Sequence, residues 1–158
     1  MKNITVEVVS QSLARSAQGK ITGSIWLSMA GREFPAIGWN DFVVIILNWW
    51  LEALLALLVR KTDLGTFQFM DGPYRVVIRF LDAERALLEF FDDHEGNGLV
   101  AASTVIKADL LAEVIGAAKQ VSDLLAEHNW VDAEVDKLRS NLASLAAVMQ
   151  PDAPNAEI

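Results

Sequence analysis

The chain has no cysteine, and this absence excludes several kinds of site at once. Without thiols it has no disulfide framework, no thiolate metal site and no cysteine nucleophile. A cysteine-free chain fits a reducing compartment. The first residues alternate between polar and apolar side chains and lack the long apolar core of a signal peptide. We therefore expect a cytoplasmic protein.

Histidine is nearly as scarce, with two residues in the chain, and neither has a ligating partner at metal-binding spacing. The sequence also lacks a Gly-x-Ser-x-Gly elbow and a Gly-x₄-Gly-Lys phosphate loop. The segment from Asp93 to Gly98 matches the start of a calcium loop, but Thr104 stands where that loop requires a bidentate glutamate. We therefore predict no metal, no cofactor and no enzymatic activity.

One apolar stretch dominates the chain. Between Phe42 and Val59 the only strongly polar residues are Asn48 and Glu52. This stretch approaches the roughly 20 residues that a transmembrane helix needs, but a carboxylate at mid-membrane depth is costly. Amphipathic strand patterns also flank it on both sides. We therefore predict a central buried helix and no membrane span.

This predicted helix has recognisable ends. Asn40 can cap its start, and Asp41 suits the positive end of the helix dipole. Arg60 and Lys61 suit the negative end. We therefore place the helix over about residues 40–60.

Strand patterns surround the apolar stretch. Alternation, or enrichment in β-branched and aromatic residues, predicts strands over residues 2–9, 21–29, 32–36, 66–70, 74–81 and 99–106. Residues 85–91 fit either a strand or a helix, and we favour a strand because turns flank them closely. Asn97 and Gly98 are a strong hairpin signal. Short turns between strands predict antiparallel pairing.

From Lys107 onward the hydrophobic period becomes helical. We predict helices over residues 107–128 and 132–149, joined at about Asn129 and packed as an antiparallel pair. Residues 151–158 form a polar tail. The whole pattern predicts an α+β fold in one domain, residues 1–150, with a mainly antiparallel sheet of six to seven strands and the helices on one face.

The two polar residues of the apolar helix need partners or a function. They lie four residues apart and so share one side of the helix. Either they are satisfied by water, Arg75 or Arg79, or they line a site for a small apolar ligand between helix and sheet. Such a site would be lined by Asn48, Trp49, Trp50 and Glu52. Core packing is the competing interpretation of the two tryptophans.

The charge of the chain is unevenly distributed. The net charge is −8, yet residues 1–81 contain eight Lys/Arg and six Asp/Glu, whereas residues 82–136 contain three Lys/Arg and thirteen Asp/Glu. Such an acidic field repels nucleic acid and attracts cationic partners. The alternative explanation is solubility alone, because a domain rich in apolar residues needs a charged exterior.

Two stretches, FPAIGWNDFVVIILNWW and FQFMDGPYRVVIRF, resemble small bacterial immunity-type proteins. Those proteins bind and neutralise a cognate polymorphic or contact-dependent toxin. The similarity lies in Gly38-Trp39-Asn40-Asp41-Phe42, in Trp50 and in the Phe69–Pro73 turn, and it covers residues 34–80. These residues fit a helix start and a β-turn, so the resemblance transfers no binding site. It implies a protein-binding module whose partner is a toxin.

The resemblance and the charge pattern together give the main functional hypothesis. The chain would be a non-enzymatic immunity protein whose acidic segment, residues 82–136, docks on a basic surface of its toxin. We predict a partner-binding set of Asp92, Asp93, Glu95 and Trp130. Neither nucleic acid nor a membrane is expected as a partner. The oligomeric state stays open, because the apolar stripe of the last helix can pair with a second copy or pack within the chain.

Overall fold

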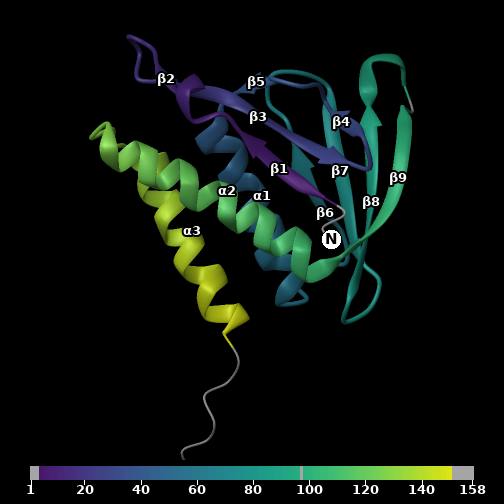
Figure 1. Ribbon diagram of the computed structural model, residues 1–158. Coiled ribbons are helices and arrows are strands. Elements are labelled where there is room, and N and C mark those ends of the chain that lie inside the picture. Colours follow the sequence, from purple (N-terminus) through teal and green to yellow (C-terminus); the bar gives the residue numbers. More distant parts are fainter. Residues whose placement is uncertain (1–3, 97, 151–158) are drawn as a thin grey trace, which may run out of the picture.

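The computed structural model describes residues 4–96 and 98–150. Within them the fold is α+β with antiparallel strands, which confirms the predicted class, although the strands form two sheets instead of one. Figure 1 shows the strands gathered on one side and the helices on the other. The polar tail, the first three residues and Asn97 of the predicted hairpin turn lie outside the described residues.

The first sheet is built around one long strand, β3 (Ile21–Met29). Every second residue of β3 is buried, which is the burial pattern that its sequence alternation predicts. The strands that pair with it are β1 (Thr5–Val8), β2 (Ala14–Arg15), β4 (Arg32–Phe34) and β5 (Asn40–Asp41). A short 3₁₀ helix, η1 (Ser10–Ser12), links β1 to β2.

The second sheet is a meander of four strands in sequence order. Its strands are β6 (Gly65–Gln68), β7 (Tyr74–Phe80), β8 (Arg85–Asp92) and β9 (Leu99–Ile106). The strand favoured over residues 85–91 is therefore confirmed. A 3₁₀ turn, η2 (Asp93–Glu95), begins the connection from β8 to β9.

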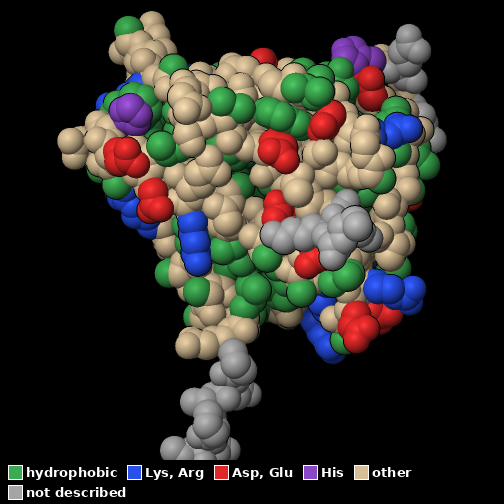
Figure 2. Space-filling view, in the orientation of Figure 1, with side chains coloured by type: hydrophobic (Ala, Val, Ile, Leu, Met, Phe, Trp, Pro, Cys, Tyr) green, Lys and Arg blue, Asp and Glu red, His purple; other side chains and the backbone are tan. Residues whose placement is uncertain are grey.

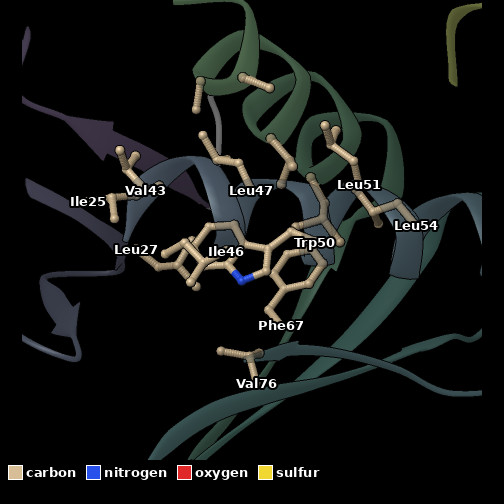
Figure 3. Close-up of a cluster of buried hydrophobic side chains, with 14 of the residues drawn as sticks. Ile25, Leu27, Val43, Ile46, Leu47, Trp50, Leu51, Leu54, Phe67 and Val76 are labelled. Atoms are coloured by element: carbon tan, nitrogen blue, oxygen red, sulfur yellow. The ribbon is translucent and has the colours of Figure 1, made fainter. Parts of the chain in front are cut away.

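The apolar segment forms α1 (Val43–Leu58), the central helix of the fold. It packs against β3 and β6 on one side and against helices α2 and α3 on the other. Figure 3 shows Ile46 and Trp50 directed toward Phe67 and Val76 of the second sheet. Among the described residues, no helix combines the length and apolar character needed to cross a membrane.

The predicted start of this helix is wrong by three residues. Asn40 does not cap it, because β5 holds Asn40 and Asp41 in extended pairing with β3, and the helix begins at Val43. The Asp41 side chain is 1% exposed and bonds to the loop after β6, where it accepts from the amides of Met70 and Asp71, both at 3.1 Å. Tertiary bonds thus override the local capping preference.

The two C-terminal helices match their predictions closely. They are α2 (Lys107–Glu127) and α3 (Ala133–Met149). Asn129 ends the first in the left-handed conformation, with φ of 57°, and Asp132 caps the second by accepting from the Val135 amide at 2.8 Å. The stripe of α3 buries Val135, Leu138 and Leu145. The helix pair covers α1, so this stripe is used for packing within the chain.

Candidate functional site

Asn48 is fully buried and belongs to a polar seam between α1 and α3. Its amide nitrogen donates to the carbonyl oxygen and to Oε1 of Glu134, both at 3.0 Å. Its oxygen accepts from Nδ2 of Asn141, also at 3.0 Å. These bonds use both donor hydrogens and the carbonyl oxygen, so a buried polar group is satisfied by the fold itself.

Glu52 extends the same seam toward solvent. Its Oε2 accepts from Asn141 at 3.3 Å and lies 3.2 Å from Nζ of Lys137. The two partners that the sequence suggested, Arg75 and Arg79, are on the sheet, whereas the polar side of α1 faces α3. Asn48 and Glu52 therefore have hydrogen-bonding partners within the fold, but these partners come from α3 and not from the sheet.

The two tryptophans of the alternative ligand site lie in and beside the core. Trp50 is fully buried, stacks on Phe67 with ring centroids 5.0 Å apart, and donates from Nε1 to the carbonyl of Gln68 at 3.0 Å. Trp49 is half-buried against the core. Three cavities among the described residues, of about 640, 280 and 200 Å³, are lined by other residues. The four predicted ligand-site residues thus form packing and polar contacts within the fold.

The acidic tip after β8 is partly neutralised within the fold. The carboxylate of Asp93 pairs with Arg75, at 2.7 Å from Nε and 3.4 Å from Nη2. The carboxylate of Asp92 lies 2.6 Å from Nδ1 of His94, and this side-chain hydrogen bond, followed by the one from the His94 amide, lowers the pKa of Asp92. The side chain of Glu95 lies outside the described residues.

Trp130 lies at a different place, in the joint between α2 and α3. Its ring stacks on His128 with centroids 4.2 Å apart, and its amide donates to the carbonyl of Leu125 at 3.0 Å. Figure 1 places this joint and the tip of the β8–β9 hairpin at opposite ends of the molecule. The structure therefore does not bring the four predicted partner-binding residues together.

The joint carries a surface of its own, which we call the joint surface. It consists of Asp123, Glu127, Trp130, Val131 and Asp136. The three carboxylates are exposed and make no hydrogen bond or ion pair with any residue that the structure describes. Figure 2 shows acidic and histidine side chains together over the end of α2, with basic side chains nearby.

Val131 lies outside the last helix, although its spacing in the sequence fits the apolar stripe of that helix. At the sequence level it continues the apolar stripe of the last helix, four residues before Val135. In the structure it precedes the N-cap Asp132 and is 64% exposed. The signal that locates it is the capping pattern, because an Asp followed by two acidic residues in the next turn marks the start of a helix.

No group of three or more His, Asp and Glu side chains within the described residues is arranged to hold a metal ion. Comparisons of the chain with protein-family models, with curated proteins and with solved structures found no match. The resemblance to immunity-type proteins therefore stays a prediction.

Proposed function

We propose that this chain is a non-enzymatic protein-binding module that docks on a basic protein through the joint surface. The observation that carries the proposal is the exposure of Val131 next to Trp130, in a joint whose exposed carboxylates have no partner among the described residues. Apolar anchors surrounded by a charged rim are typical of protein interfaces. The partner we propose is a bacterial toxin, as the immunity-type resemblance implies.

Trp130 is held in place before binding. Its backbone is fixed by the bond to Leu125, its ring rests on His128, and its inner side packs on the core. A side chain that is already ordered loses little conformational freedom on association. Tryptophan also supplies the largest contact area of any side chain, so Trp130 and Val131 form the expected centre of the interface.

The carboxylates of the joint surface are expected to raise the association rate and to favour a cationic partner. Asp123 and Glu127 are one turn apart on α2, and Asp136 lies in the first turn of α3. Their carboxylates form no ion pair or hydrogen bond with any residue that the structure describes, so they are available to a cationic surface. At the hairpin tip, by contrast, Asp93 is offset by Arg75. We therefore place the interface at the joint.

The test uses the protein encoded beside this chain in its genome, since toxins and their immunity proteins are expected to be neighbours. Its binding to the purified chain is measured by biolayer interferometry at low and at high salt. Trp130→Ala should weaken binding by about 30-fold or more, the effect of a central aromatic anchor. The double variant Glu127→Gln/Asp136→Asn should slow association and flatten its salt dependence.

Matched controls keep the test specific. Asp92→Asn/Asp93→Asn removes the same charge from the other end of the molecule. It should leave the association and dissociation rates of the partner unchanged. Ile37→Ala truncates an aliphatic residue in the loop between β4 and β5. Ile37 is 73% exposed, which is similar to the 64% of Val131. Binding that ignores Trp130→Ala but responds to the hairpin-tip variant would reject the interface. A neighbouring protein that does not bind would reject the proposed partner.

A further inference from the structure

A cavity at the C-terminal end of α1 is not used by the proposed interface. Its volume is about 640 Å³, which lies within the range of roughly 300–1,000 Å³ that small-molecule sites occupy. Three separate segments line it: the end of α1 with the turn after it, the end of β7 with the turn that leads to β8, and the first residue of α2. Leu57, Leu58 and Phe80 supply an apolar part of the lining.

Each of the three segments contributes one cation to the lining: Arg60, Arg79 and Lys107. Within the described part of the chain, the side chains of Arg60 and Arg79 form no hydrogen bond or ion pair. Lys107 is held in place without a counter-charge, because its Nζ donates to the carbonyl of Asp82 at 3.3 Å and lies 4.7 Å from the ring centroid of Phe80. The lining therefore presents uncompensated positive charge.

Two acids also line the cavity, but one of them is already satisfied. The carboxylate of Asp82 accepts from Nε and Nη2 of Arg85 at 3.0 and 2.9 Å, and from the amides of Glu84 and Arg85. Because Arg85 offsets the charge of Asp82, only Asp63 opposes the three cations. The balance of the lining favours an anion.

Arg60 occupies a backbone position that is unfavourable for arginine. Its φ is 59°, and it closes the end of α1 through bonds from its own amide to Leu57 and from the Lys61 amide to Ala56, at 3.2 and 2.8 Å. This hydrogen-bond pair is the Schellman motif, whose left-handed residue is usually glycine. A cation is thus placed at the cavity in the conformation where a residue without a Cβ fits best.

Lys107 also breaks a local rule. It is the first residue of α2, and a cation at the N-terminus of a helix opposes the helix dipole. The N-cap residue, Ile106, supplies no side-chain hydrogen bond to the helix amides. Both unfavourable choices meet at one cavity, where an anion would offset the cation at the helix N-terminus and would pair with the Arg60 side chain.

We propose that this cavity binds a small molecule that carries a phosphate group next to an apolar or aromatic moiety. Two guanidinium groups and an ammonium exceed the charge of a monoanion, and arginine pairs with phosphate through two parallel hydrogen bonds. The apolar moiety packs on Leu57, Leu58 and Phe80. The site is independent of the joint surface and of its partner.

Isothermal titration calorimetry with phenyl phosphate, inorganic phosphate and benzoate tests this site. The protein should bind phenyl phosphate more tightly than either of the others, because only phenyl phosphate offers both the dianion and the ring. Arg79→Gln should weaken phenyl phosphate binding by about tenfold or more, the loss expected for a charge-assisted hydrogen bond. Lys119→Gln removes an exposed cation of α2 outside the cavity and should leave the affinity unchanged.

The decisive variant is Arg60→Gly, which removes the cation and relieves the backbone at the same time. Glycine suits the left-handed position, so this variant should fold with a raised melting temperature while its phenyl phosphate affinity falls by about tenfold or more. A more stable variant that keeps the affinity would overturn the proposal. So would a wild type that binds benzoate as tightly as phenyl phosphate, or that binds neither.

Discussion

Replacing Asp41 by alanine should destabilise the fold more than any exposed acidic substitution. Its buried carboxylate accepts four hydrogen bonds and joins three segments. Oδ2 accepts from Nε1 of Trp39 at 2.9 Å and from the amides of Met70 and Asp71 at 3.1 Å. Oδ1 accepts from the amide of Phe42 at 2.7 Å, just before α1 begins. Alanine leaves these donors without their acceptor.

The expected magnitude follows from these contacts. A hydrogen bond to a charged group contributes about 1.5–3 kcal/mol, and an unsatisfied buried donor costs about 1–3 kcal/mol. The four bonds share one carboxylate and some donors regain water, so they do not add. We expect Asp41→Ala to lower the free energy of unfolding by about 3–5 kcal/mol. That is a large share of the roughly 5–15 kcal/mol that stabilises a typical domain.

Urea denaturation followed by tryptophan fluorescence and by far-ultraviolet circular dichroism measures this loss. Asp41→Asn keeps the shape and one acceptor oxygen and should cost less than alanine, about 1–3 kcal/mol. Asp63→Ala removes an exposed acid after α1 and should change stability by less than about 0.5 kcal/mol. If Asp41→Ala costs less than about 1 kcal/mol with an unchanged m-value, the carboxylate does not join these segments as described.

Three further predictions concern the polar seam between α1 and α3, the hydrophobic core, and the loss of stability at low pH. Asn48→Ala should cost about 2–4 kcal/mol, and a double-mutant cycle with Asn141→Ala in urea denaturation should show coupling of about 0.5–3 kcal/mol; additive effects would disprove the seam. Trp50→Ala should cost about 3–5 kcal/mol in the same assay, as expected for a fully buried indole, and a loss under about 1 kcal/mol would contradict its place in the core. The Glu84 amide and then Arg85 lower the pKa of Asp82 below its ordinary value in the folded protein, so its contribution to stability is present above that ordinary value and is lost as the pH falls through the folded pKa. Urea midpoints from about pH 6 to about pH 3 should therefore fall more steeply for the wild type than for Asp82→Asn, and parallel curves would exclude this contribution.

Hydrophobic periodicity in the sequence predicted the long strands and helices whose buried face repeats along the chain. The alternation in Ile21–Met29 and the helical stripes after Lys107 reflect which face of each element is buried, and the structure confirms both. The division into two sheets is different in kind. It depends on which strand pairs with β3, and a two-residue strand such as β5 has no periodicity to detect.

Long-range contacts account for the predictions that failed. The amide of Asn48 bonds to Glu134, which is 86 residues away along the chain, so spacing within α1 could not identify that partner. Likewise, the count of acidic residues located the negative charge but could not show which carboxylates are already paired. Arg75 forms its ion pair with Asp93 because β7 pairs with β8. Trp130 was expected in the interface because of its place at a helix end, and it keeps that place in the proposal.

Hydrogen exchange tests the proposed recognition surface most directly. Exchange of the chain alone is compared by mass spectrometry with exchange of the chain mixed with the protein encoded beside it. We predict slower exchange across residues 123–136 in the complex and no change across residues 91–96, with α1 the most protected helix in both samples. Slower exchange at the hairpin tip, with the joint unchanged, would contradict the proposed surface.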